Sequence, residues 1–465
     1  MSSSVKEWAE TPLSRLIEPL QTGSRPRGGV RSSTTGVPSI GGEHLTSSGT
    51  FNFTNTKYVP QDFFDSMRRG RIKPGDVLVV KDGATTGKVA LVRDDFPFDR
   101  AVVNEHVFIC RPLDAVDPEY LFWFLYSPEG QRRILEHFQG SAQGGINQTF
   151  APGTHVPLAP RDEQRAIARV LNSADRSGRS AIAHFVAARR AIERFRQAVR
   201  AGAVSGRLTE DWRDLNPNLE RRDDPVEAAR QRRRDQLGRR FREPEANPHA
   251  NGPEVPASWG YATLGLLLEG IKYGTSKRSD YDSTGVPVLR IPNVSGERLD
   301  ITDLKRAELD DKEAESLRLR EGDLLMIRSN GSVQLVGKTG LVTGEAVGMT
   351  YAGYLMRLRA DPEVLVPEYL SIALSSFSVR NQIELPARST SGVHNINTDE
   401  VRGLVIPLPP IPEQGEIISR VEELLRAADL VDARIVACSR KIDRTSQAVL
   451  AKAFRGDLAA SERTP

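Results

Sequence analysis

Apolar residues recur at alternating steps of four and three through two long stretches, residues 161–208 and 411–458. A stripe at this 3.5-residue period keeps facing one partner helix, so the pattern predicts two long helices that pair as a coiled coil. At 1.5 Å per residue, each helix is expected to be about 60 Å long. The first stripe is Ile167, Leu171, Ala174, Gly178, Ala181, Phe185, Ala188, Ile192, Phe195 and Val199, and the second is Ile417, Val421, Leu424, Ala428, Val431, Ile435, Cys438, Ile442, Thr445 and Val449.

The two stretches are copies of one sequence. Gln164 matches Gln414 at a separation of 250 residues (414 − 164), and the same separation joins the matched positions 197 and 447, and 206 and 456. Both stretches open Pro-x-x-Glu-Gln and close Gly-x-Leu. Unrelated amphipathic helices packed on separate cores would not share caps, ends and register, so we interpret the chain as an internal duplication.

The region before each helix is repeated more loosely. Residues 75–80 and 322–327 both read Gly-Asp followed by four apolar residues, which predicts a strand entered through a tight turn. Pro118 and Pro367 each precede a glutamate and are expected to open a short helix. The predicted fold class is therefore mixed α/β (α+β), with two globules that each end in a long helix.

The connector between the two halves has no counterpart after the second helix. It is rich in charge and proline and poor in apolar residues, which argues against an independent core. Its arginines at 230–242 are able to contact phosphate, but interleaved acids favour a solvated helix on a linker. We expect the connector to return the second globule to the far end of the first helix, so that the helices run antiparallel with pseudo-two-fold symmetry. The expected boundaries are 1–160 for the first globule, 161–208 for its helix, 209–256 for the connector, 257–410 for the second globule, 411–458 for its helix and 459–465 for a C-terminal tail.

Composition and charge predict a soluble, cytoplasmic protein. The chain has 64 Lys and Arg against 61 Asp and Glu, a net charge of +3, so it is not a polybasic binder. Two cysteines, Cys110 and Cys438, provide neither a disulfide framework nor a zinc site, which fits a reducing compartment. Residues 1–8 lack the apolar core of a signal peptide, and no apolar run approaches the ~20 residues that span a membrane.

This organisation resembles a known family. Two variable α/β globules, each followed by a near-identical helix that opens Pro-x-x-Glu-Gln and closes Gly-x-Leu, look like the specificity subunit of type I restriction-modification systems. The stretch Leu-Thr-Glu-Asp-Trp-Arg at 208–213 and the restart Val255-Pro256-x-x-Trp259 also resemble that family. The resemblance covers essentially the whole chain.

The resemblance implies a non-catalytic DNA-binding subunit. Each globule would be a target recognition domain that reads one half of a split, asymmetric sequence in double-stranded DNA. The paired helices would hold the domains apart and dock two methyltransferase (modification) subunits, and restriction subunits would supply ATP-driven translocation and cleavage. S-adenosylmethionine, ATP and Mg²⁺ would then be bound by partner subunits, with no cofactor on this chain.

No sequence motif predicts catalysis or metal binding. Gly-Lys-Thr at 337–339 resembles the end of a phosphate-binding loop, but the required earlier glycine is Ser332 and strand-like residues follow, so a β-turn is predicted. The seven histidines lack the spacing of metal ligands. Asn-Pro-Asn at 216–218 lacks the aromatic with which an amino-methyltransferase grips a flipped base.

DNA contacts are expected from four polar stretches in each globule: an early loop, the hairpin after the Gly-Asp strand, a Gly/Ser-rich loop near the end, and the turns at 104–106 and 350–354. Arg, Lys, Asn and Gln side chains pair with base edges in the major groove; the alternative for each is ordinary surface polarity. The candidates are Arg25, Arg27, Lys81, Thr85, Lys88, Gln143, Asn147 and Gln148 in the first globule, and Lys277, Arg278, Arg328, Asn330, Lys338, Arg388, Ser391, His394 and Asn397 in the second.

Two other functions remain open at this point. A single-chain restriction enzyme would need nuclease and methylase motifs, which we do not find. The second alternative is a coiled-coil DNA-binding or scaffold subunit of a related defence or methylation system without restriction.

Overall fold

The structure, a computed structural model, describes residues 8–26, 29, 35–140, 144–217, 224–294, 299–387 and 392–456. The chain forms two compact units, Met1–Val186 with Ile435–Pro465, and Ala187–Arg434. Each unit contains one globule together with part of each long helix. Within the residues described, no helix is long and apolar enough to cross a membrane.

The first globule is built on two small sheets. Four strands pair antiparallel in the order β2-β8-β5-β6, and three pair in the order β4-β3-β7, in which β3 and β7 are parallel. Strands β1 and β9 form a separate antiparallel ladder. The strands are β1 Ala9–Pro12, β2 Gln21–Thr22, β3 Val37–Ile40, β4 Lys57–Val59, β5 Val77–Val80, β6 Val89–Leu91, β7 Val102–Val103, β8 Val107–Cys110 and β9 His155–Leu158, and the helices are α1 Gln61–Ser66, α2 Pro118–Tyr126, α3 Pro128–Leu135 and α4 Phe150–Gly153.

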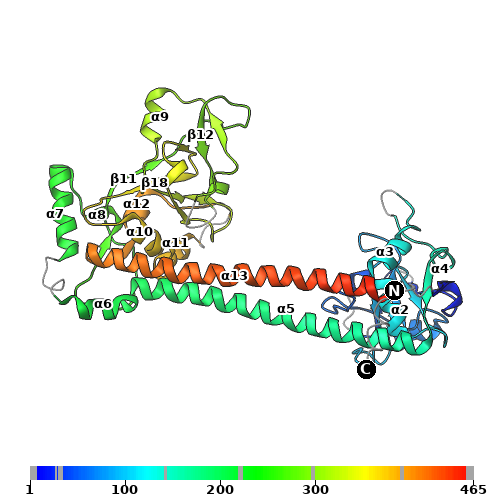
Figure 1. The fold of residues 1–465 in the computed structure, drawn as a ribbon. Helices are drawn as coiled ribbons and strands as arrows, with labels where there is room; N and C mark the ends of the chain where they lie inside the picture. Colours follow the sequence, from blue (N-terminus) through cyan, green and yellow to red (C-terminus); the bar gives the residue numbers. More distant parts are fainter. Residues whose placement is uncertain are drawn as a thin grey trace, which may run out of the picture. The chain divides into compact units, whose positions relative to one another are not determined.

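The second globule repeats this topology. Its sheets have the orders β11-β18-β14-β16 and β13-β12-β17, and β12 and β17 are again the parallel pair. Strands β10 and β20 form the ladder that matches β1-β9, and β15 pairs with β19. The strands are β10 Gly260–Thr263, β11 Leu268–Tyr273, β12 Val286–Leu289, β13 Lys305–Ala307, β14 Leu324–Ile327, β15 Ser329–Asn330, β16 Thr339–Leu341, β17 Thr350–Tyr351, β18 Leu355–Ala360, β19 His394–Asn395 and β20 Val405–Leu408. The helices are α8 Leu264–Leu267, α9 Asp311–Leu317, α10 Pro367–Ser375, α11 Phe377–Ala387 and α12 Thr398–Arg402; Figure 1 shows α9 and β12 at one end of this unit and α10 and α11 beside α13.

The strand predicted after each Gly-Asp turn is confirmed, and it separates two cores. In β5, Val77 and Val79 pack with α2, whereas Leu78 and Val80 face the cluster on the other side of the sheet. Residues 324–327 of β14 alternate in the same way. Because successive strand residues point to opposite faces, four apolar residues in a row require a strand covered on both sides.

The aspartate of each turn is structural. Asp76 is fully buried and accepts hydrogen bonds from Arg111 at 2.7 and 2.8 Å, and Asp323 is held in the same way by Arg359 at 2.7 Å. The hydrogen bond to Asp76 raises the pKa of Arg111, and that to Asp323 raises the pKa of Arg359. A buried carboxylate needs such a partner because an isolated charge would be expensive to desolvate.

The two predicted long helices are present as α5, Arg161–Val204, and α13, Ile411–Ala453. Their segments pack antiparallel within each unit (Figure 1). In the first unit, a Cβ on Gly178 would lie 3.5 Å from Ile442 Cγ2. In the second unit, Arg189 pairs with Asp432 at 2.8 Å and the next cross-helix pair links residues 196 and 429 at 2.6 Å.

The predicted apolar stripe is wrong at alternate positions near the middle of the helices. Phe195 and Val431 are 42% and 47% exposed, and Cys438 is exposed as well. The polar side chains of Arg196 and Asp432 lie closer to the partner helix instead, with 18% and 25% exposure. The stripe is in phase again at Val199 and Ile435, which are 5% and 7% exposed, so single positions turn away from the partner helix while their neighbours in the stripe stay buried.

The connector is more ordered than a solvated linker. It forms α6, Glu210–Leu215, and α7, Pro225–Leu237, before the 3₁₀ turn Gly238–Arg240. Val226 and Ala229 of α7 are buried in the core of the second unit. The expectation of a fully solvated helix is therefore wrong for one face of α7, because two apolar residues three positions apart suffice to dock a helix turn.

Candidate nucleic-acid interface

The early loop of each globule leaves its sheet at a glycine that packs directly against a neighbouring strand. A side chain on Gly23 would collide with the carbonyl oxygen of Val103, and a side chain on Gly274 would collide with that of Tyr351. Only glycine allows two backbones to approach this closely. The polar residues that follow are thereby held beside the turns at 104–106 and 352–354.

In the first globule, the structure brings three of the four polar stretches together in what we call the first polar edge: Arg25, Lys81, Asp82, Glu105 and His106. Arg25 Nε lies 2.7 Å from Glu105 Oε1, and His106 Nδ1 lies 2.5 Å from Asp82 Oδ1. Lys81 Nζ donates to the backbone oxygen of Glu105 at 3.1 Å. The base of the remaining stretch, the Gly/Ser-rich loop, is adjacent, because the amide of residue 146 donates to the Lys81 carbonyl at 2.7 Å.

The second globule has a corresponding second polar edge: Tyr273, Arg328, Asn330, His394 and Thr398. The Arg328 guanidinium lies 4.5 Å from the centroid of the Tyr273 ring, and Thr398 Oγ1 donates to the Tyr273 hydroxyl at 2.7 Å. Asn330 is paired with His394 across β15 and β19. Arg328 also donates to the backbone oxygen of residue 353 at 3.2 Å, so the fourth stretch joins this edge too.

The two edges differ in charge composition. The first contains the carboxylates of Asp82 and Glu105, which pair with its basic groups. In the second, the contacts of the Arg328 guanidinium are with a backbone oxygen and the Tyr273 ring, and it forms no ion pair with a carboxylate in the part of the chain that the structure describes. Stacking on Tyr273 positions its guanidinium without neutralising it.

Lys277 and Arg278 lie on the early loop of the second globule and are held by acids. Lys277 Nζ is 3.1 Å from Glu313, and Arg278 is 3.5 Å from Asp280 with its side chain 90% exposed. Thr85, in the first hairpin, lies close to Gly42, and Gln148 is exposed on the loop before α4.

Asn147 and Asn397 use their side-chain oxygens for local structure. Asn147 accepts from the amide of Thr149 at 2.8 Å, and Asn397 caps α12 by accepting from the amides of residues 399 and 400 at 2.9 Å. Asn397 is thus a helix cap, and Asn147 forms a turn in which its side chain accepts from the amide two residues later. Because the side-chain oxygens are already used, DNA contact through Asn147 and Asn397 would be made by their side-chain NH₂ groups.

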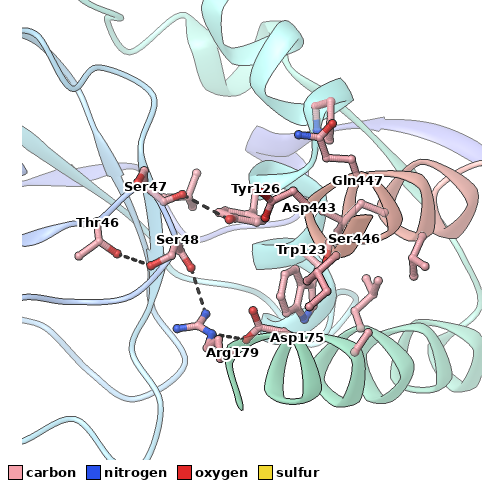
Figure 2. A pocket seen from close by; sticks show the side chains of 18 of the residues that line it. Thr46, Ser47, Ser48, Trp123, Tyr126, Asp175, Arg179, Asp443, Ser446 and Gln447 are labelled. Atoms are coloured by element: carbon pink, nitrogen blue, oxygen red, sulfur yellow. Dashed lines mark hydrogen bonds and ion pairs between the residues drawn. The ribbon is translucent and has the colours of Figure 1, made fainter. Parts of the chain in front are cut away.

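Lys88 lies away from the first polar edge. It lines a cavity of about 630 Å³ between the loop at 46–48, α2 and the helix segments of the first unit. Figure 2 shows Arg179 at the edge of this cavity, where it pairs with Asp175 at 2.7 Å and donates to the backbone oxygen of Ser48 at 3.0 Å. Lys338, the matching residue of the second globule, is exposed next to Gly337, where a side chain would meet Ile383 of α11.

The remaining candidates Arg27, Gln143, Arg388 and Ser391 lie outside the described residues. The expected β-turn at 337–339 is confirmed, because Gly337 has a φ of +77° and β16 begins at Thr339. Across the described ranges, no group of three or more His, Cys, Asp or Glu side chains is placed to hold a metal ion.

The motif that opens each long helix has a role that sequence reasoning did not assign. Gln164 is buried; its oxygen accepts from the Asp117 amide at 2.7 Å and its nitrogen donates to two backbone oxygens. Gln414 makes the matching bonds, with the amide of Val366 at 2.8 Å. The sequence feature that could have indicated this role is the recurrence of a glutamine at the start of both helices, Gln164 and Gln414.

In the second unit, the preceding glutamate adds a second set of bonds. Glu413 is 1% exposed and accepts from Thr209 Oγ1 at 2.7 Å and from Trp259 Nε1 at 2.7 Å. Arg213 lies 2.5 Å from the same carboxylate. Thr209 and Arg213, which follow the first long helix, and Trp259, at the start of the second globule, therefore meet at the buried carboxylate of Glu413.

Comparison with known proteins gives one consistent assignment. The specificity subunit of the type I restriction enzyme EcoKI from Escherichia coli K12 is 27% identical over 418 residues, which cover 90% of this chain and 81% of that protein. The StySPI specificity subunit from Salmonella potsdam is 25% identical over 419 residues, with the same two coverages. No protein-family model matches the chain.

Solved structures share the fold. A chain from a study of complex assembly and conformational transition in a type I R-M system aligns with a TM-score of 0.63 and 18% identity, covering 98% of this chain and 100% of that one. The HsdS subunit from Thermoanaerobacter tengcongensis aligns with a TM-score of 0.53 and 19% identity, covering 97% of both chains. With the duplicated topology, the paired helices and relatives aligned over nine-tenths of its length, the chain is similar throughout to the specificity subunits of type I restriction enzymes.

Proposed function

We propose that this chain is the non-catalytic subunit that selects the DNA target of a type I restriction-modification complex. The observation that carries the proposal is the pair of polar edges: each globule brings the same stretches of its sequence to one place, and the side chains there are suited to base edges. The proposed recognition domains are residues 1–160 and 257–410, joined by the connector 209–256.

The chemistry of the edges supports an asymmetric, bipartite target. An arginine without a carboxylate partner, such as Arg328, is suited to guanine, which offers two acceptors in the major groove. The first edge combines basic groups with Asp82 and Glu105, and carboxylates accept hydrogen bonds from cytosine amino groups. Two edges of different chemistry would select two different half-sites.

The proposed partners are double-stranded DNA, two methyltransferase subunits on the long helices, and restriction subunits. S-adenosylmethionine, ATP and Mg²⁺ would be bound by those partners in the cytoplasm, and this chain would supply only binding and orientation. We expect co-expression with the methyltransferase to give a complex of one specificity and two modification subunits. A lone chain that is monodisperse and binds its target with full specificity would contradict this assembly.

The direct test is to map methylated sites in cells that carry the complex and then alter one edge. Arg328→Gln should weaken binding to the target by about 1–3 kcal/mol and relax one half-site only. Lys338→Gln is the matched control, since Lys338 lies on the same hairpin but outside the second polar edge. Mobility-shift assays on duplexes substituted at each position would measure both effects.

An exchange of domains tests whether the two half-sites are read independently. Replacing residues 1–155 with those of another family member should change one half-site and leave the other intact. If the complex methylates DNA without any sequence preference, or if no complex with a methyltransferase forms, the chain would instead be a scaffold of a related defence system.

A further inference from the structure

The connector carries a run of arginines that the structure divides into two groups. The first group is neutralised: Arg230 pairs with Glu243 at 3.1 Å and also contacts Glu227, and Arg232 lies 2.7 Å from Asp361. Arg234 lies 3.8 Å from Glu227. These three arginines attach α7 to its surroundings, which is the structural role that a mixed-charge helix most often has.

The second group is not neutralised. Arg239, Arg240 and Arg242 are exposed, and none of the three forms an ion pair with a carboxylate among the described residues. Residues 237–242 read Leu-Gly-Arg-Arg-Phe-Arg and contain no acid. Arg242 donates to two backbone oxygens, at 2.7 and 3.1 Å. Three guanidinium groups within four residues repel one another, so this turn is suited to an anionic ligand.

The turn is held in a defined place. Phe241 packs partly buried against the core of the second unit, and the guanidinium of Arg234 lies 5.6 Å from the centroid of its ring. Its neighbours Arg239 and Arg240 belong to the 3₁₀ turn that ends α7. The three cations are therefore presented by an anchored turn and not by a freely moving linker.

Strand β11 links this turn to the second polar edge. Arg233, on the last turns of α7, donates to the backbone oxygen of Glu269 at 3.4 Å, near the start of the strand. Burial lowers the pKa of Arg233, while the nearby carboxylate of Asp361 acts in the opposite direction. The strand ends at Tyr273, four residues later, which is about 13 Å at 3.3 Å per residue.

We infer that Arg239, Arg240 and Arg242 bind phosphates of DNA that flanks the half-site contacted by the second globule. This inference rests on the proposed function. Phosphates recur every 3.4 Å along the axis of each strand, so the contacts would fall roughly four base pairs or more outside the bases at the second polar edge. Arginine is suited to this role because its guanidinium binds phosphate with paired hydrogen bonds.

The test compares two triple variants of the complex with its methyltransferase. R239Q/R240Q/R242Q removes the proposed phosphate contacts, and R230Q/R232Q/R234Q removes the same charge from the neutralised group. Binding to the methylation target is measured by fluorescence anisotropy across a salt series. The first variant should reduce the slope of log affinity against log salt by about 2.7, at 0.9 per phosphate, and the control should leave the slope unchanged.

Duplex length gives a second measurement. With a duplex cut off at the second half-site, the first variant should bind like the unmodified complex, because the flanking phosphates are absent. With a duplex extended by about ten base pairs on that side, the unmodified complex should bind roughly tenfold more tightly than the variant at low salt. Discrimination between target and scrambled bases should stay the same in both.

Each remaining outcome is decisive. Equal slopes for the first variant and the unmodified complex, or equal losses for both triple variants, would overturn the inference. A variant that binds DNA normally but loses its methyltransferase would place the arginines at a protein interface and overturn it as well. An unmodified complex that does not distinguish target from scrambled duplex would refute the proposed function itself. The effect of the first variant on the salt dependence of binding could still be measured on either duplex, so the two failures can be told apart.

Discussion

The junction between globule and long helix is built twice in this chain, with the same glutamine and different surroundings. Gln164 and Gln414 make equivalent hydrogen bonds to the backbone of their globules. At the second junction the preceding residue, Glu413, gathers Thr209, Arg213 and Trp259 around one buried carboxylate. The glutamine bonds are common to both junctions, whereas Thr209 and Arg213 are connector residues that bind at the second junction.

The helix segments next to the junctions differ as well. In the second unit, Arg196 bridges Glu193 and Asp429 across the two helices. The matching positions in the first unit are Ser446, Asp443 and Arg179, all of which line the 630 Å³ cavity (Figure 2). Ser446 is smaller than Arg196, its counterpart in the other helix, so this one difference between the repeats accounts for part of the cavity.

The largest effect is expected from Glu413→Ala. Removing one partner of a buried ion pair leaves Arg213 and the Trp259 N–H unpaired, so the free energy of unfolding should fall by about 3–5 kcal/mol. Glu416→Ala is the control, because Glu416 pairs with Arg420 at the helix surface and should change stability by less than about 1 kcal/mol. Urea unfolding of the purified complex measures both. Equal effects of the two variants would show that the cluster around Glu413 does not stabilise the junction.

An intermediate and symmetrical effect is expected from Gln164→Ala and Gln414→Ala. Each removes a side chain that is at most 1% exposed and leaves one backbone amide and two carbonyl groups without their partner. We expect a loss of about 2–3 kcal/mol for each variant, from the cost of buried unsatisfied groups. Because the bonding is equivalent, the two losses should agree within about 1 kcal/mol. A large difference would mean that the connector, and not the repeated glutamine, holds the second junction.

The smallest effect is expected from exchanging the residues that differ along the helices. Ser446→Arg would introduce an arginine three residues after Asp443, as Arg196 follows Glu193, and should stabilise the first unit by about 0.5 kcal/mol. Arg196→Ser should destabilise the second unit by a similar amount. The shifts in urea midpoint are expected to have opposite signs. A destabilising Ser446→Arg would indicate that the cavity cannot accept an arginine and that its shape is set by Arg179.

Much of this protein was determined by the sequence alone. The strict spacing between Gln164 and Gln414 and the recurring Gly-Asp strands predicted two like globules and two long helices, because helix and strand periods are local properties of the chain. The turn at Asn147, the helix cap at Asn397 and the turn at Gly337 follow from equally local chemistry.

Tertiary structure alone decided the rest. That Lys81 and Arg328 join the polar edges while Lys88 lines a cavity depends on which face of a two-stranded hairpin each residue occupies, and that depends on packing far away in the sequence. Phe195 was predicted to be buried, yet it is exposed while Val199, one turn later, is buried, so the packing of the two helices decides which stripe positions are covered. Glu413, Trp259 and Arg213 are separated by up to 200 residues, so their meeting at one buried acid depends on how the connector folds back, which no local pattern encodes.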